Sequence, residues 1–348
     1  MSDTVRIGVV GAGANTRLHH IPKLKKIAGV EIASVVNRSR ASSERVAQEF
    51  GIERVHDRWQ DLVNDPGIDA VVIGTWPYLH CPITLAALAA GKHVLTEARI
   101  AMNATEARQM LAASRVRPDL VTQVVPGPST FAADPMLMQL LADGYVGELQ
   151  SIDLRVPSGF MNRDAPLHWR MNRDYSGVNI MSMGIWYECL SRWVGPATAV
   201  MARTRIAVPY RLDEERGERR AVTVPDHVEV IADLTNGAIA RMHLSSVAGF
   251  MPGPEVWVYG ADGTLRLEMR GRDCVLWGGR RDDKAMKEIA IPADKTYGWR
   301  VEDEFIGAIR GQEPIRRTSF LDAVNYMDFT EAVHISSREG RRVHLPLA

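Results

Sequence analysis

A glycine-rich turn near the start of the chain is the first arrangement of residues that could do chemistry. An apolar run over residues 5–10 leads into Gly11, Gly13 and a helix-like stretch. Gly11 permits a tight turn, and Gly13 lets the backbone approach a pyrophosphate without a Cβ in the way. The N–H groups and the dipole at the start of a helix favour an anion, so the turn predicts a dinucleotide ligand. Its predicted contacts here are Gly11, Gly13, Ala14, Asn15 and Thr16.

The end of the second apolar run bears on which dinucleotide is bound. In a unit of this kind an acidic residue at this place binds the ribose 2'-OH of NAD, whereas arginine accommodates the 2'-phosphate of NADP. The chain offers no carboxylate there but reads Asn37, Arg38, Ser39 and Arg40. Two guanidinium groups and a hydroxyl favour NADP over NAD by charge. The alternative is that Arg38 and Arg40 are only the solvated start of a helix.

Two further segments follow predicted strands. One runs from Gly74 to His80 and the other from Gly91 to Arg99. Ligands of open α/β sheets bind outside the carboxyl ends of parallel strands, so both segments are candidates to line the cofactor. The predicted contacts are Thr75, Trp76, Pro77, His80 and Glu97. For His80 the alternative is a role in fixing the loop that follows the third strand.

Composition and charge narrow the class of protein. The 348 residues are 46% hydrophobic and 24% charged, which is ordinary for a globular protein with two domains. Lys+Arg and Asp+Glu number 42 each, which favours a small-molecule substrate over nucleic acid or a membrane surface. Cys81, Cys189 and Cys274 are widely spaced and indicate neither a disulfide framework nor a metal site. With no export signal or apolar span, we expect a cytoplasmic protein.

The elements that must position these residues can be read from the apolar pattern. In the first third, strands are predicted at 7–10, 31–36, 70–74, 93–97 and 120–125, and helices at 18–27, 41–50, 83–90 and 104–115. Alternation of this kind predicts parallel strands joined by helices. We therefore expect a dinucleotide-binding Rossmann domain over residues 1–125.

The character of the sequence changes after residue 126. A helix is predicted at 135–143, followed by strands at 150–156, 199–205, 227–234, 238–246, 255–259 and 264–268, and by helices at 302–310 and 321–337. Long polar connections between strands favour an antiparallel sheet with helices laid on it. We expect a second, α+β domain over 126–348, for substrate binding and oligomerisation. The charged run 214–220 is interpreted as a solvated loop.

Taken in order, these segments resemble the Gfo/Idh/MocA family, named for glucose-fructose oxidoreductase and inositol dehydrogenase. The matching segments are the Gly-Ala-Gly turn, 75–80, the Gly-Lys-His-Val-Leu-Thr-Glu run at 91–97, 144–149, Trp169-Arg170, 260–265 and 305–314. The resemblance implies a Rossmann domain and a C-terminal domain whose open sheet contributes a substrate pocket over the nicotinamide. It also implies hydride transfer at a secondary alcohol of a sugar, cyclitol or related hydroxy compound, and a homodimer or homotetramer formed through the C-terminal sheet.

The chain departs from the family at two positions where chemistry is expected. Family members continue the glutamate with Lys-Pro, and that lysine holds the reacting oxygen, whereas Glu97 is followed here by Ala98 and Arg99. Family members also carry an Asp-x-Gly-x-His segment, and the aligned residues here are Ser182 and Trp186 in place of the acid and the base. Indole only donates a hydrogen bond, so tryptophan cannot accept the substrate proton. We therefore expect a non-standard proton relay.

Other polar residues lie near both positions and could replace the missing lysine and histidine. Arg99 can orient and stabilise an oxygen or a carboxylate, although its high pKa makes it a poor proton shuttle. His168 is the first candidate base, and Tyr187 or Glu188 could take the proton instead. The alternative is a purely structural role, in which His168 and Trp169 pack under a loop and Arg170 pairs with an acidic residue. The predicted substrate contacts are Arg99, His168, Trp169, Arg170, Asn179 and Trp186.

Two other groups of polar residues contain types that can bind a metal ion or act in catalysis. His19 and His20 point about 100° apart on a helix, so packing or cofactor contact is favoured over a shared metal ion. Asp226 and His227 precede a strand and are interpreted as a turn. Neither group changes the main hypothesis.

Three functions remain open from the sequence. The leading one is an NAD(P)-dependent oxidoreductase with a replaced proton relay. The second keeps the nicotinamide but oxidises the substrate only transiently, as in a lyase, hydrolase or epimerase. The third is a regulatory protein that binds a dinucleotide without chemistry.

Overall fold

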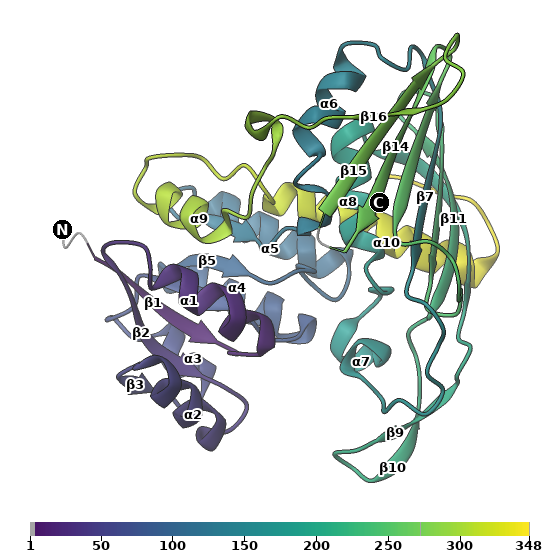
Figure 1. The fold of residues 1–348 in the computed structure, drawn as a ribbon. Coiled ribbons are helices and arrows are strands. Elements are labelled where there is room, and N and C mark those ends of the chain that lie inside the picture. The colour runs from purple at the N-terminus through teal and green to yellow at the C-terminus, as the bar shows by residue number, and fades with distance from the viewer. Residues whose placement is uncertain (1–3, 272, 348) are drawn as a thin grey trace. The chain divides into compact units, whose positions relative to one another are not determined.

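The computed structural model describes residues 4–271 and 273–347. The chain forms two compact units, drawn in Figure 1. Unit 1 comprises Met1–Pro126 and Arg300–Met327, and unit 2 comprises Gly127–Trp299 and Asp328–Ala348. The sequence predicted one boundary at residue 125, and the structure adds the return of Arg300–Met327 to unit 1. Composition could not show that Arg300–Met327 belongs to unit 1, because this depends on which hydrophobic core the segment packs against.

Unit 1 is built on a sheet of six strands in the order β3-β2-β1-β4-β5-β6. All of its neighbouring strands pair in parallel. The strands are β1 (Val5–Val10), β2 (Val30–Val36), β3 (Arg54–Val55), β4 (Ala70–Ile73), β5 (His93–Thr96) and β6 (Thr122–Val124). This is the strand order of a doubly wound dinucleotide fold, so the predicted Rossmann domain is confirmed.

Helices cover the sheet of unit 1 and are defined by local signals. Ser39 caps α2 by accepting the Ser42 N–H, and Gly51 ends that helix at a φ of 63°. Asn103 caps α5 by accepting the Glu106 N–H. The helices of this unit are α1 (Ile21–Leu24), α2 (Arg40–Phe50), α3 (Trp59–Val63), α4 (His80–Ala89), α5 (Ala104–Val116), α9 (Val301–Ile309) and the first part of α10 (Phe320–Glu339).

One predicted helix of unit 1 has a different form in the structure. The expected helix over 18–27 is a helical run over 14–24 in which Thr16–His20 is π-helical and Ile21–Leu24 is α-helical. A turn follows at once, and Gly29 takes a φ of 68°. π-Helical turns widen the backbone locally and are frequent at functional sites.

Unit 2 is built on a nine-stranded sheet in the order β16-β15-β14-β13-β7-β12-β11-β8-β17. Its strand pairs are antiparallel except for β12 and β7, so the prediction of a mainly antiparallel sheet is confirmed. The strands are β7 (Leu149–Pro157), β8 (Ala197–Arg205), β11 (His227–Leu234), β12 (Ile239–Ser245), β13 (Glu255–Gly260), β14 (Gly263–Arg270), β15 (Asp273–Arg280), β16 (Lys287–Ile289) and β17 (Val343–His344).

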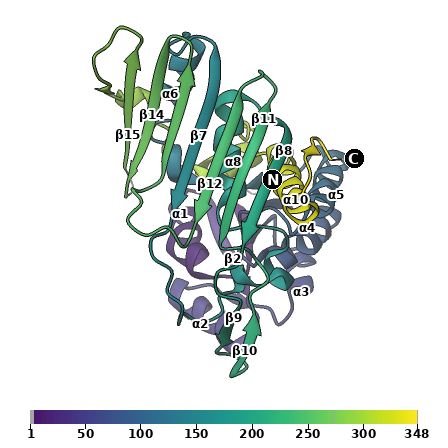
Figure 2. The same ribbon diagram turned by 90° about the vertical axis from the view of Figure 1, so that its right-hand side faces the viewer.

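Helices of unit 2 cover one face of this sheet. They are α6 (Asp134–Ala142), α7 (Arg173–Ser176), α8 (Met183–Val194) and the last part of α10. Tyr187 of α8 stacks on Phe329 of α10, and Ser336 accepts the backbone N–H of Ala202 on β8. Figure 2 shows the opposite face toward the viewer, and no helix of the described chain lies over it. Side chains alternate between the two faces, so β11 buries Val228 and Val230 under the helices.

Several elements of unit 2 were not predicted, among them the short helix α7 and the strands β15, β16 and β17. Part of the charged run 214–220 belongs to a hairpin, because β9 (Tyr210–Asp213) pairs with β10 (Glu218–Ala221). Its polar side chains hide the apolar alternation that signals a strand. Helix α8 was also not predicted, although eight of its residues are buried. Across the described residues, no helix combines the length and apolar character needed to cross a membrane.

Candidate active site

The glycine turn after β1 is shaped by one strained position and one open position. Gly11 has a φ of 84°, and a Cβ there would lie 2.7 Å from Thr75 Cγ2 and 2.8 Å from the Thr75 nitrogen. A Cβ on Gly13 would meet only the Gly74 carbonyl oxygen, at an ordinary 3.7 Å. Gly11 is therefore required by the fold itself, whereas Gly13 is not. The bare backbone at Gly13 fits the close approach of a diphosphate.

Thr16 stands where the Gly-x-Gly-x-x-Gly pattern of dinucleotide-binding turns has its third glycine, and it does so without pushing the helix away. Its side chain is buried, and its Oγ1 lies 3.4 Å from the Gly11 carbonyl oxygen. The space comes from Gly74 at the end of β4, where a Cβ would overlap both Thr16 and the Gly11 carbonyl. The glycine that allows close packing has thus moved from the helix to the neighbouring strand end. The residues present fit a Rossmann dinucleotide cradle.

The segment after β2 anchors the glycine turn through Asn37 and places Arg40 in an ion-pair cluster. Asn37 accepts the Ala12 N–H at 2.7 Å and donates to the Ser42 carbonyl at 3.2 Å. Arg40 binds Glu44 and Asp57, at 2.9 Å and 3.0 Å.

Arg38 is exposed beside Ser39, the N-cap residue of α2. Both predicted arginines are therefore exposed at the start of α2, and Arg40 binds two carboxylates there.

A buried imidazole links the segment after the glycine turn to β5. His20 Nδ1 lies 2.7 Å from Glu302 Oε1, and His20 Nε2 lies 3.0 Å from Glu97 Oε1. Asn15 also donates to Glu97. Burial alone would lower the pKa of His20, but hydrogen bonds and charge from Glu302 and Glu97 raise it to about 9. The same contacts outweigh burial at Glu97 and lower its pKa.

This network gives Asn15 and Glu97 fixed places beside the turn, and it contains two residues that the sequence did not assign to the site. For His20 the sequence favoured packing or cofactor contact without naming a partner, and the role of Glu302 depends on a contact across 282 positions of the chain. No local signal could have identified Glu302.

His80 joins the two loops that follow β4 and β5. Its Nδ1 lies 3.0 Å from the Arg99 carbonyl oxygen and its Nε2 lies 2.9 Å from the Thr75 carbonyl oxygen. The ring is fully buried, which lowers its pKa. Both nitrogens face backbone carbonyls, and the neutral ring can donate to one of them, so His80 lies between the two loops and contacts both.

The other residues of these loops differ in exposure. Pro77 is buried, and the rings of Trp76 and Tyr78 lie 6.5 Å apart at a tilt of 54°. The Arg99 side chain is 4% exposed. The next residue, Ile100, donates its N–H to Tyr326 Oη at 2.6 Å, which holds the backbone after Arg99 in place.

In unit 2, the two residues after Trp186 make structural contacts. Tyr187 stacks on Phe329 with ring centroids 3.6 Å apart, and its hydroxyl accepts the Ala197 N–H at 2.8 Å. Burial raises the pKa of Tyr187 to about 12. Glu188 binds Arg192 at 3.0 Å, and Trp186 is 5% exposed. Packing and ion pairing therefore account for Tyr187 and Glu188 without chemistry.

His168, Trp169 and Arg170 form a short stacked segment. The Arg170 guanidinium lies 4.2 Å from the Trp169 ring centroid, and the His168 and Trp169 rings lie 5.5 Å apart. His168 Nδ1 accepts the Arg170 backbone N–H at 3.3 Å. Burial and then the Arg170 charge lower the pKa of His168. Nδ1 is the acceptor, so the proton of the neutral ring lies on Nε2.

The remaining predicted substrate residue, Asn179, is almost fully buried and donates to the Ser176 carbonyl at 2.6 Å. Asp226 accepts the Ala207 N–H through both carboxylate oxygens, at 2.9 Å and 3.0 Å. That contact agrees with the interpretation of Asp226 as a turn residue. His227 begins β11.

Comparisons with known proteins agree with this architecture. The model of an oxidoreductase family with an NAD-binding Rossmann fold, GFO_IDH_MocA, matches residues 5–123, and the GFO/IDH/MocA C-terminal domain matches residues 136–266. A dTDP-3,4-didehydro-2,6-dideoxy-alpha-D-glucose 3-reductase of Streptomyces antibioticus is 28% identical over 97% of this chain and 98% of its own. A 1,5-anhydro-D-fructose reductase of Ensifer adhaerens is 33% identical over 51% and 52%.

Solved structures share the fold. A levoglucosan dehydrogenase in complex with NADH and L-sorbose superposes with a TM-score of 0.84, at 21% identity and over 99% of both chains. An NAD binding oxidoreductase from Klebsiella pneumoniae gives a TM-score of 0.81 at 22% identity, over 99% of this chain and 100% of its own. The two domain models together match well over half of the sequence. The chain therefore belongs to the GFO/IDH/MocA family of NAD(P)-dependent oxidoreductases.

Proposed function

We propose that the protein transfers a hydride between a nicotinamide dinucleotide and a secondary alcohol or ketone of a sugar, cyclitol or related hydroxy compound. The observation that carries the proposal is the cradle of Gly11, Gly13 and Gly74, in which Gly13 alone lacks a packing reason to be glycine. Sugar-acting relatives support the substrate class. A bound nicotinamide would supply the site that accepts or gives the hydride.

We propose NADP as the preferred cofactor. The support is charge, because no carboxylate follows β2 and Arg38 is exposed there. Arg38, helped by the Ser39 hydroxyl, would bind the 2'-phosphate, because this exposed arginine stands just after the end of β2. Asn37 holds the turn beside them through Ala12.

We also propose a proton relay that replaces the usual lysine and histidine. Arg99 would orient the reacting oxygen, since a guanidinium donates several hydrogen bonds and keeps its charge. His168 would exchange the substrate proton through Nε2, because its Nδ1 accepts the Arg170 N–H. To donate during ketone reduction the ring must first be an imidazolium, so that loss of the Nε2 proton leaves a neutral imidazole; the remaining proton is then on Nδ1, which has to release the Arg170 N–H. Tyr187 and Glu188 become weaker candidates because both are buried in other contacts.

The partner we propose for the protein is a second copy of itself, bound through the uncovered face of the nine-stranded sheet. Three large apolar side chains on that face are about half exposed, namely Met201 at 51%, Ile231 at 54% and Ile239 at 49%. Ile231 pairs with Met201 across β11 and β8, so two of them form a continuous patch. Burying apolar surface is the main driving force of such association.

A binding and turnover measurement tests the function. NADP and NAD are titrated into the wild type and into Gly13→Ala, which meets no close protein atom and should fold normally. We expect tighter binding of NADP by the wild type and a loss of about tenfold or more in Gly13→Ala, because a Cβ would block the diphosphate. Arg38→Gln should weaken NADP binding by a similar factor and leave NAD binding unchanged.

Absorbance of reduced nicotinamide is then followed against a panel of polyols, sugars and sugar acids. Net reduction with any of them supports the oxidoreductase, and Arg99→Ala should lower that rate. Turnover without net reduction would favour the transient-oxidation alternative. Binding without any turnover would favour a regulatory protein. Equal cofactor affinity in the wild type and Gly13→Ala would contradict the proposed cradle.

A further inference from the structure

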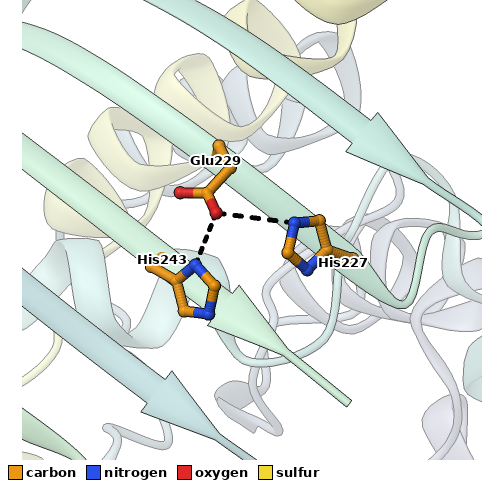
Figure 3. A group of neighbouring side chains, drawn as sticks. All are labelled: His227, Glu229 and His243. Atoms are coloured by element: carbon orange, nitrogen blue, oxygen red, sulfur yellow. Dashed lines mark hydrogen bonds and ion pairs between the residues drawn. The ribbon is translucent and has the colours of Figure 1, made fainter. Parts of the chain in front are cut away.

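A cluster of two histidines and a glutamate lies on the uncovered face of the nine-stranded sheet, outside the residues discussed for cofactor or substrate. It consists of His227 and Glu229 on β11 and His243 on β12, shown in Figure 3. One ligand atom of each residue lies within 4.8 Å of those of the other two. We propose that this cluster is a binding site for a divalent transition-metal ion of the Zn²⁺ type. The proposal is independent of the redox function.

The sheet itself brings the three residues together. Glu229 lies directly opposite His243 in the antiparallel register, and His227 lies two residues before Glu229 on the same face of β11. The positions therefore depend on backbone pairing and not on a flexible loop. A site built on strands keeps its geometry before an ion binds, which lowers the cost of binding.

The distances suit a tetrahedral ion. Bonds of about 2.0–2.1 Å to nitrogen or oxygen place neighbouring tetrahedral ligands about 3.3 Å apart. His227 Nε2 lies 3.5 Å from Glu229 Oε1, longer than an ordinary N–H···O bond. His243 Nδ1 lies 2.5 Å from the same oxygen and would have to move back by less than about 1 Å. All three residues are partly exposed in the single chain, so an ion can enter there. Glu229 shares its strand face with Ile231, so in the proposed pair of copies the ion would lie beside the interface.

A second contact orients one of the ligands. His227 Nδ1 lies 3.0 Å from Ser245 Oγ, and Ser245 is fully buried and opposite His227 in the register. This contact turns Nε2 toward Glu229. Metal-bound histidines usually engage their second nitrogen in this way, which fixes the ring. The two imidazole rings meet edge to face, 5.3 Å apart at 80°.

The charges around the cluster weaken its affinity for a divalent ion. Glu229 is the only acid in the ligand set, and on the other side of β11 Arg203 stands opposite Glu229 while Arg205 stands opposite His227. On β7, Arg155 stands opposite His243. These three neighbouring cations oppose a divalent ion. Three protein ligands also leave a fourth position for water. We therefore expect weaker binding than at a closed four-ligand zinc site.

Titration with Co²⁺ tests the proposal, because a Co²⁺ ion in a site of low coordination number absorbs visible light. The full-length protein is treated with chelator, desalted and titrated, and Zn²⁺ is then added as a competitor. We expect one Co²⁺ per chain and its displacement by Zn²⁺. Glu229→Gln, His227→Gln and His243→Gln should each weaken binding by about tenfold or more. His344→Gln, an exposed histidine on β17 of the same sheet, is the matched control and should bind as the wild type does.

Two further measurements keep the result interpretable. Unfolding temperatures without metal establish that each variant folds, and Glu229→Gln is the safest because that side chain is 46% exposed. Ser245→Ala should lower affinity by about 10–100-fold, because it removes the orienting contact with His227; it also removes the acceptor of the Val247 N–H, so its unfolding temperature is compared with that of the wild type. A wild type that gives no Co²⁺ band, or a Glu229→Gln variant that binds as the wild type does, would overturn the proposal.

Discussion

At the scale of single residues, the buried His20 makes the most specific prediction. Its pKa of about 9 lies above the ordinary 6.5, so the folded state holds the proton more tightly than the unfolded state. The resulting stabilisation is fully present below pH 6.5 and is lost as the pH rises to 9. The free energy of unfolding of the wild type should fall on the order of 3 kcal/mol across this window. Urea unfolding at a series of pH values measures it.

His20→Gln supplies the comparison, because glutamine keeps a hydrogen-bond donor but cannot titrate. We expect that the free energy of unfolding of this variant does not fall between pH 6.5 and 9. His19→Gln removes the neighbouring imidazole, and this variant should still show the decline in the free energy of unfolding. If His20→Gln and the wild type showed parallel pH profiles, the charge that we assign to the His20–Glu97–Glu302 network would be wrong.

The sequence predicted residues with local signatures and missed those defined by distant contacts. Gly11 and Gly13 are recognisable because a tight turn and a bare backbone leave a mark within a few positions. The compensation of Thr16 by Gly74 is not visible, because the two are 58 positions apart and meet only when β1 and β4 pair. The predicted roles of Arg99 and His168 remain proposals, since each depends on a bound substrate.

At the scale of elements, a buried ion-pair network joins α6 to α8. Asp134 accepts hydrogen bonds from Arg192 at 2.7 Å and from the Trp193 indole at 2.8 Å, and Glu188 binds the same guanidinium. Burial would lower the pKa of Arg192, but Cys189, Asp134 and Glu188 outweigh it and raise the pKa. The guanidinium therefore stays charged inside the unit.

Asp134→Asn should destabilise the protein by about 3 kcal/mol, because it removes one counter-charge of a buried cation and can turn an amide donor toward it. Thermal or urea unfolding at neutral pH measures the change. Asp143→Asn, at the exposed end of α6, is the matched control and should change stability by less than about 0.5 kcal/mol. An Asp134→Asn variant as stable as this control would show that the network adds little.

Helix α8 also illustrates why some elements escaped the sequence. It begins without a side-chain cap, and its buried residues Trp186, Tyr187 and Glu188 mix aromatic and charged types. Trp186 aligns with the histidine base of the family, so the sequence suggested a catalytic role for the neighbouring Tyr187 and Glu188. By contrast, β1, β4 and β5 were predicted because buried parallel strands read as short continuous apolar runs.

At the scale of the whole molecule, fold class followed from the order of elements, but the division of the chain did not. Alternating strands and helices predict a parallel sheet, and later strands with long connections predict an antiparallel one. The assignment of Arg300–Met327 to unit 1 depends on contacts such as Val124 N–H to the Thr318 carbonyl, at 3.0 Å. Such a backbone contact leaves no trace in the side-chain pattern.

Self-association through the uncovered sheet face is the prediction that concerns the whole molecule. Ile231 lies in the middle of β11 and is 54% exposed, so aspartate can replace it without entering the core. Placing a charge within a buried apolar interface is costly, and the dimer dissociation constant should rise by about tenfold or more. Sedimentation velocity over a range of concentrations measures it.

Leu212→Asp is the matched control, because Leu212 is 47% exposed but lies on the β9–β10 hairpin and not on the large sheet. We expect this variant to associate as the wild type does. Unchanged unfolding temperatures in both variants would separate an interface effect from a folding effect. A wild type that stays monomeric at the highest concentration, or equal dissociation constants for Ile231→Asp and Leu212→Asp, would rule out this face as the surface on which two copies meet.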